Sequence, residues 1–137
     1  MVSLVTGGAG FIGSHLCELL REKGDSVLVL DDFSTGRRDN LEKLAEDPEV
    51  QLVEGTILDQ GLVNSLVQQA DRVFHLAAAV GVKLVVQRPL HTANVNLLGT
   101  HHVLEAAATS GTPVLIASSS EAYGNQAAQR VQESTPS

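Results

Sequence analysis

The segment TGGAGFIGSHL, residues 6–16, follows a short apolar strand pattern and leads directly into a helical pattern. Both the GxGxxG and the GxxGxxG spacing fit its glycines, which are Gly7, Gly8, Gly10 and Gly13. Glycines at such a spacing permit a tight turn, let a pyrophosphate approach the backbone, and let the helix pack close to the sheet. The start of the helix adds unpaired N–H groups and the positive end of the helix dipole. The segment therefore predicts a phosphate-binding turn between a first strand and a first helix.

A second strand pattern, residues 26–30, ends in Asp31. This acid lies about 20 residues past the glycines, where dinucleotide-binding folds hold a ribose hydroxyl. A carboxylate there accepts hydrogen bonds from the ribose hydroxyls of NAD and would repel the 2′-phosphate of NADP. Asp31 therefore predicts NAD as the cofactor. Arg37 and Arg38 lie nearby and leave an NADP-linked reductase open as an alternative.

Strand and helix patterns alternate along the chain. The strand patterns are short and rich in Val, Leu and Ile, and they cover residues 2–5, 26–30, 50–54, 72–76 and 113–117. The helical patterns cover residues 11–23, 39–46, 61–69 and 90–109. This alternation predicts an α/β fold of the Rossmann type, a doubly wound parallel sheet in three α/β/α layers with strand order 3-2-1-4-5. A ligand would then bind over the carboxyl ends of strands 1 and 4, where the order reverses.

Length and composition favour a single domain, because the chain has 137 residues, of which 43% are hydrophobic. Its net charge of −7 argues against nucleic acid or an anionic membrane as a partner. No apolar run approaches a membrane span of about 20 residues, and the chain starts with a core strand rather than a signal peptide. Cys17 lies among apolar helix residues and the histidines lack metal-ligand spacing. We therefore expect no metal and a cytoplasmic location.

Five stretches together resemble one family, and they occur in the family's order: residues 6–16, 30–36, 75–78, 96–100 and 118–124. On these stretches the chain is similar to the amino-terminal part of the extended short-chain dehydrogenases/reductases, in the group of NAD-dependent nucleotide-sugar epimerases and dehydratases. Within that group it looks closer to UDP-glucose 4-epimerases and UDP-glucuronate decarboxylases. The resemblance implies an epimerase-like enzyme that transiently oxidises C4 of a UDP- or dTDP-sugar, with NAD as hydride acceptor.

The resemblance also implies which residues bind NAD. They are Gly7, Gly10, Phe11, Ile12, Gly13, Asp31, Asp32, Ser34, Thr35, Gly36, Thr56, Ile57, Leu76, Ala77, Ala78 and Asn96. The family places an Asp-Ile pair beside the adenine, where this chain has Thr56-Ile57, so that contact is weaker or rearranged. Asp59 could replace the missing acid or could cap the helix that follows it. Asn96 could lie at the cofactor or could only brace the fold.

For catalysis the resemblance implies Ser119, which would bond the sugar hydroxyl that is oxidised, with Glu121 as an auxiliary polar group. Dehydratases of the family carry Asp-Glu directly after the hydroxyl residue, whereas here a serine precedes the glutamate. The family's YxxxK motif, which supplies the base, is absent, because Ala127 follows four residues after Tyr123, the only tyrosine. We therefore expect residues 1–137 to be an incomplete NAD-binding domain that is inactive alone. A stand-alone NAD-binding sensor or scaffold is the alternative.

The helical pattern of residues 90–109 is apolar on nearly all sides. Such a helix needs burial on more than one face, and the YxxxK helix that would flank it in the family is absent. We therefore expect a homo-oligomer that associates through this helix, or a tail, residues 118–137, that folds over it.

Overall fold

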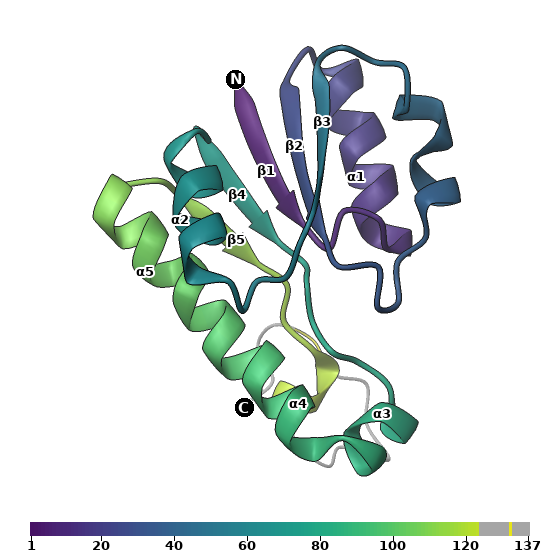
Figure 1. Ribbon diagram of the computed structural model, residues 1–137, viewed down its shortest axis with the longest axis vertical. Coiled ribbons are helices and arrows are strands. Elements are labelled where there is room, and N and C mark those ends of the chain that lie inside the picture. The colour runs from purple at the N-terminus through teal and green to yellow at the C-terminus, as the bar shows by residue number, and fades with distance from the viewer. Residues whose placement is uncertain (124–131, 133–137) are drawn as a thin grey trace.

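The computed structural model describes residues 1–123 and residue 132, and these contain a five-stranded parallel sheet (Figure 1). The strands are β1 (Val2–Thr6), β2 (Ser26–Asp31), β3 (Val50–Glu54), β4 (Arg72–His75) and β5 (Val114–Ile116). Their order is β3-β2-β1-β4-β5, and every neighbouring pair is parallel. The predicted fold class and strand order are confirmed. The order reverses between β1 and β4, whose carboxyl ends are therefore the expected position of a ligand.

Helices cover both faces of this sheet. α1 (Phe11–Glu22) and the 3₁₀ turn η1 (Arg38–Leu44) lie on one face, and α2 (Gln60–Gln68) and α5 (Thr100–Ser110) lie on the other (Figure 1). This arrangement gives the three layers that the alternation of strands and helices predicts.

A separate hydrophobic core fills the space on each face. Successive strand residues point to opposite faces, so neighbours in the sequence enter different cores. The core beneath α2 and α5 takes Leu4, Leu28, Leu30 and Val73 from the strands. The core beneath α1 and η1 takes Val5, Val27 and Val29. Burial on both faces explains why the central strands are almost entirely apolar.

The predicted helix over residues 39–46 is instead the 3₁₀ turn η1. Its two buried side chains, Leu41 and Leu44, are three residues apart. That spacing matches the three residues per turn of a 3₁₀ helix, so a short tight turn buries both leucines. Asp39 and Asn40 at its start favour turns over helix interiors, which weakens the α-helical alternative.

The predicted helix over residues 90–109 is confirmed as a continuous rod but not as a uniform α-helix. It consists of α4 (Pro89–Ala93), a π-helical turn η2 (Asn94–Gly99) and α5. A short helix that the sequence did not predict, α3 (Val82–Gln87), precedes it. Proline at the first position of α4 separates the two, because proline suits a helix start and ends the helix before it. In Figure 1, α3 and α4 lie beyond the carboxyl ends of β4 and β5.

Candidate functional site

The turn after β1 depends on two glycines that touch other backbone. Gly7 has a φ angle of 71°, and its N–H donates to the carbonyl of Leu30 at 2.8 Å. A Cβ atom at Gly7 would lie 2.8 Å from the backbone nitrogen of Ala77, two residues past the end of β4. A Cβ atom at Gly13 would lie 2.2 Å from the carbonyl oxygen of Gly7. Glycine at these positions therefore lets the turn, the first helix and the end of β4 pack directly together.

Gly10 differs from these two glycines. Its φ of −74° and ψ of 173° suit any residue, and a Cβ atom there would approach only the carbonyl oxygen of Gly7, at 3.2 Å. Gly10 is also the N-cap of α1, with no side-chain cap and no acidic residue in the first turn. The N–H groups at the start of α1 are therefore not capped by an acidic side chain of the first turn. Because residue 10 is a glycine, no side chain of that residue fills the space in front of them. This combination fits a phosphate-binding cradle.

Asp31 lies at the end of β2 and braces this cradle. Its side chain is buried, and Oδ2 accepts a hydrogen bond from the N–H of Ala9 at 2.8 Å. Oδ1 accepts another from the N–H of Phe33 at 2.9 Å. Each carboxylate oxygen can accept more than one hydrogen bond, so the same group can also receive hydroxyl donors. The sequence predicted only this second role and missed the first.

The segment after Asp31 folds back onto the glycine turn. The carbonyl of Ala9 accepts hydrogen bonds from the N–H of Arg37 at 3.0 Å and from Nδ2 of Asn40 at 2.8 Å. A Cβ atom at Gly36 would lie 2.9 Å from Oδ1 of Asp31, so this position also requires a small residue. The remaining predicted residues of this segment, Asp32, Ser34 and Thr35, are exposed.

Of the two arginines in this segment, Arg38 already has partners within the chain. Its guanidinium pairs with Glu54 and lies 4.4 Å from the centre of the Phe33 ring. A group held by a carboxylate and an aromatic ring is less available to a 2′-phosphate, which weakens the argument for NADP.

The segment after β3 uses its polar groups locally. Oγ1 of Thr56 accepts a hydrogen bond from the N–H of Leu58 at 3.2 Å. Asp59 is the N-cap of α2 and accepts from the N–H of Leu62 at 3.0 Å, so the capping alternative is the one observed. Ile57 is buried, and its carbonyl bonds Nδ1 of His102 at 3.1 Å.

Asn96 holds the segment that follows β4. Its Oδ1 accepts a hydrogen bond from the N–H of Ala79 at 2.8 Å, and its Nδ2 donates to the carbonyl of Ala79 at 3.1 Å. The bracing role of Asn96 is therefore observed. The predicted small residues of this segment, Ala77 and Ala78, directly precede the braced position.

The catalytic candidates lie at the same edge of the sheet. The N–H of Ala117, just past β5, donates to the carbonyl of His75 at the end of β4, at 3.2 Å. Ser119 follows two residues later and is exposed, and its carbonyl accepts from the N–H of Ala122 at 3.2 Å. Glu121 belongs to the 3₁₀ turn η3 (Ser120–Tyr123). Ala127 and most of the expected tail lie outside the described residues.

A family model described as GDP-mannose 4,6 dehydratase matches residues 4–137, nearly the whole chain. The chain belongs to the GDP-mannose 4,6-dehydratase family. The resemblance to nucleotide-sugar epimerases and dehydratases that the five sequence stretches suggested is thereby confirmed.

Proteins that catalyse different reactions are similar to the chain. A UDP-N-acetyl-alpha-D-glucosaminuronate decarboxylase of Bacillus cytotoxicus is 41% identical over 121 residues, which are 88% of this chain and 37% of that protein. A UDP-glucose 4-epimerase of Mycolicibacterium smegmatis is 38% identical over 139 residues, covering 99% of this chain and 44% of that protein. The structure of a dTDP-glucose 4,6-dehydratase from Streptomyces venezuelae, solved with NAD bound, matches with a TM-score of 0.91 and 35% identity. That match covers 99% of this chain and 45% of the dehydratase, so the chain spans less than half the length of these relatives.

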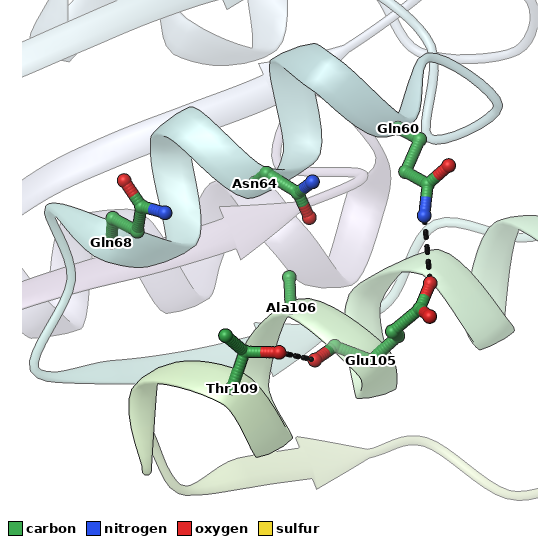
Figure 2. Close-up of a pocket in the computed structure, with 6 residues that line it drawn as sticks. All are labelled: Gln60, Asn64, Gln68, Glu105, Ala106 and Thr109. Atoms are coloured by element: carbon green, nitrogen blue, oxygen red, sulfur yellow. Dashed lines mark hydrogen bonds between the residues drawn. The ribbon is translucent and has the colours of Figure 1, made fainter.

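A separate groove of about 220 Å³ lies on the outer surface between α2 and α5 (Figure 2). Gln60, Asn64 and Gln68 line it from α2, and Glu105, Ala106 and Thr109 line it from α5. Nε2 of Gln60 donates to Oε2 of Glu105 at 2.7 Å across the groove. None of the residues that the sequence predicts for cofactor or catalysis lines it, so we do not assign the family's cofactor to this groove.

Neither a metal site nor a membrane span is found in the part of the chain that the structure describes. No group of three or more His, Cys, Asp or Glu residues there is placed to hold a metal ion. No helix in the same part is long and apolar enough to cross a bilayer. Cys17 is buried in the core beneath α1, and this burial raises the pKa of its thiol to about 12. Its role is therefore packing.

Proposed function

We propose that residues 1–137 form the NAD-binding part of a nucleotide-sugar epimerase of the UDP-glucose 4-epimerase type. The observation that supports this most strongly is the open position at Gly10, in front of a helix start without a side-chain cap. Asp31, fixed by two backbone N–H groups, lies at the end of the neighbouring strand. A dinucleotide needs an anion cradle and a hydroxyl acceptor together, and these residues supply both.

The proposed contacts follow the edge of the sheet. The pyrophosphate would lie against the turn from Gly7 to Gly13, including the N–H groups of Phe11 and Ile12. The adenosine half would lie against Asp31 and the residues that follow β2 and β3: Asp32, Ser34, Thr35, Gly36, Thr56 and Ile57. The nicotinamide half would lie against the end of β4 and its brace: Leu76, Ala77, Ala78 and Asn96. The buried carboxylate of Asp31 supports NAD over NADP, because a 2′-phosphate would meet a negative charge.

The proposed chemistry is a transient oxidation at C4 of a UDP- or dTDP-sugar. NAD, when bound, supplies the hydride acceptor. The hydroxyl of Ser119 would hydrogen-bond the C4 hydroxyl and hold it for proton removal, and Glu121 would add a polar contact. The sequence contains no YxxxK motif, so the chain carries no tyrosine–lysine pair to remove that proton. We therefore propose that residues 1–137 bind cofactor but do not turn over sugar by themselves.

A decarboxylase is the second candidate reaction, favoured by the 41% identity to a UDP-sugar decarboxylase. A dehydratase is less well supported, because a serine stands where dehydratases of the family carry the aspartate beside the glutamate. A stand-alone sensor would need neither Ser119 nor Glu121, so their presence supports an enzyme. In all three enzyme readings the partner is a nucleotide-sugar, the protein is cytoplasmic and homo-oligomeric, and neither nucleic acid nor membrane takes part.

NADH fluorescence titration of the purified chain tests the proposal, with NADPH titrated in parallel. We expect saturable binding of NADH and weaker binding of NADPH. UDP-glucose is then incubated with the chain and NAD, and we expect no UDP-galactose. Absence of NADH binding, or equal binding of NADPH, would overturn the cofactor assignment. Formation of UDP-galactose would overturn the proposed lack of turnover.

A further inference from the structure

One buried histidine links three elements beside the proposed cofactor site. His75, the last residue of β4, is only 3% exposed. Its Nδ1 lies 2.7 Å from Oγ1 of Thr6, the last residue of β1. Its Nε2 lies 3.0 Å from Oγ1 of Thr100, the first residue of α5. A single imidazole therefore joins two central strands to the helix on one face of the sheet.

The neutral imidazole ring can satisfy both threonines at once. It carries one proton, so it donates to one threonine hydroxyl and accepts from the other. Oγ1 of Thr6 also accepts from the N–H of Ala77 at 3.3 Å and keeps a second lone pair and its own proton for Nδ1. Burial lowers the pKa of His75, which favours the neutral ring over the charged one.

The two partners of His75, Thr6 and Thr100, lie next to segments that form or hold the proposed cofactor site. Thr6 directly precedes Gly7, whose position leaves no room for a side chain against Ala77. Thr100 directly follows η2, which contains Asn96. The side-chain amide of Asn96 bonds both the N–H and the carbonyl of Ala79. The hydrogen bonds that join Thr6, His75 and Thr100 are called the relay below. Together with the contacts between Asn96 and Ala79, the relay ties the end of β4, on both sides of Ala77, to the helical rod of α4, η2 and α5.

We propose that His75 is a positioning residue of the cofactor site, which fixes the separation between the glycine turn and the end of β4 without touching the cofactor. The inference rests on the proposed function, since NAD is the ligand that this separation serves. A pyrophosphate and ribose held between these two segments lose contacts when the segments drift apart, because hydrogen bonds weaken steeply with distance and angle.

Two amide substitutions of His75 distinguish its hydrogen bond to Thr6 from its hydrogen bond to Thr100. In His75→Asn the side-chain amide reaches the position of Nδ1 and can keep the bond to Thr6. In His75→Gln the amide reaches the position of Nε2 and can keep only the bond to Thr100. We expect NADH affinity to fall roughly tenfold in His75→Gln, the scale of one buried hydrogen bond, and distinctly less in His75→Asn.

Substitutions of Thr100 test its hydrogen bond to His75 from the other side. Thr100→Val removes the hydroxyl that bonds His75 with little change of shape, whereas Thr100→Ser keeps it. We expect a rise of roughly three- to tenfold in the Kd for NADH in Thr100→Val and a value near that of the unaltered chain in Thr100→Ser. Val103→Ala on the same helix is the control for stability, because Val103 is fully buried but takes no part in the relay. It should lower the urea midpoint without changing the Kd, measured where every variant is folded.

Amide hydrogen exchange of the chain without ligand gives a second readout. We expect faster exchange in Thr100→Val than in Thr100→Ser at Gly7 and at Ala77, and no such change in Val103→Ala. If NADH binds the unaltered chain but its Kd and these exchange rates are the same in Thr100→Val and Thr100→Ser, the positioning role is wrong and the proposed function stands. If NADH does not bind the unaltered chain, both are wrong.

Discussion

The carboxylate of Asp31 and the backbone N–H of Ala9 are joined by a hydrogen bond of 2.8 Å, which connects the end of β2 to the turn between β1 and α1. The residue that the sequence marks as the reader of a ribose is thus also a brace of the phosphate cradle. Removing its charge should therefore affect both the choice of cofactor and the shape of the turn.

The first prediction is that Asp31→Asn weakens NADH binding by roughly tenfold or more and reduces the preference over NADPH. Hydrogen bonds to charged groups are worth about 1.5–3 kcal/mol, and an amide cannot accept through both of its ends. Paired titrations of NADH and NADPH measure the effect. Asp39→Asn, an exposed change of equal charge in η1, is the control. An unchanged ratio of the two affinities in Asp31→Asn would contradict the assigned role.

The second prediction separates two glycines of the same turn. Gly10→Val should abolish NADH binding, because its side chain would fill the space that the pyrophosphate needs. The chain should stay folded, because a Cβ atom at this position approaches only one carbonyl oxygen, at 3.2 Å. Gly13→Ala should instead lower the free energy of unfolding by roughly 1–3 kcal/mol, because its Cβ would lie 2.2 Å from the carbonyl oxygen of Gly7. Circular dichroism during urea unfolding, combined with NADH titration, distinguishes the two. Retained binding in Gly10→Val would show that the cofactor lies elsewhere.

The third prediction concerns the thiol of Cys17. It is fully buried, and burial raises its pKa to about 12, so a thiol reagent at pH 8 should label it only through unfolding. Its sulfur lies beneath the glycine turn, 3.4 Å from where a Cβ of Gly8 would be. NADH at ten times its Kd should slow labelling roughly tenfold by stabilising the folded state. Labelling of the folded chain as fast as that of the urea-unfolded chain would refute the burial argument.

The fourth prediction is a loss of stability in acid that depends on Asp25. Its carboxylate accepts from Oγ of Ser3 at 2.7 Å and pairs with Arg72, and these contacts hold its pKa below the usual range. A carboxylate whose pKa is lowered in the folded state stabilises the protein at pH values above its ordinary pKa of about 3.9. This stabilisation is lost as the pH falls through and below that value. The difference in urea midpoint between the unaltered chain and Asp25→Asn should therefore shrink between pH 6 and pH 3. A difference that stays constant over this range would contradict the assignment.

The fifth prediction concerns self-association through the helical rod. Leu97, Leu98 and Leu104 are exposed by 74%, 44% and 43%, as the apolar pattern of this rod led us to expect. We expect light scattering to show a dimer or larger species, and Leu97→Glu to shift it toward monomer. Leu19→Glu is the control, since Leu19 is 46% exposed on α1, on the opposite face of the sheet. A monomer at all concentrations would require the tail, residues 118–137, to cover the rod instead.

The strands and their order could be predicted because they depend on local patterns. Runs such as Val27 to Leu30 are short, rich in valine and apolar throughout, which is typical of strands buried on both faces. The glycine spacing and Asp31 then locate the edge of the sheet where a ligand binds.

The sequence could not show the contacts that brace the site, because they join distant residues. His75 meets Thr6 across 69 positions, and His102 meets Ile57 across 45, and no periodicity marks either pair. Asp59 fits two roles equally in the sequence, and only the bond to Leu62 decides between them. The π-helical turn is also hidden, because its residues suit an α-helix and its extra width accompanies the contact between Asn96 and Ala79.

The central place of β1 has a consequence for the order of folding. Val2 pairs with Ser26 of β2, and Ser3 pairs with Arg72 of β4, so β1 has both neighbours only when the chain is complete to the end of β4. Parallel strands far apart in sequence close large loops and come together slowly. The glycine turn lies near the beginning of the chain, but it is held on both sides only after β4, far along the sequence, has paired with β1. We expect it to be among the last segments to become protected during refolding.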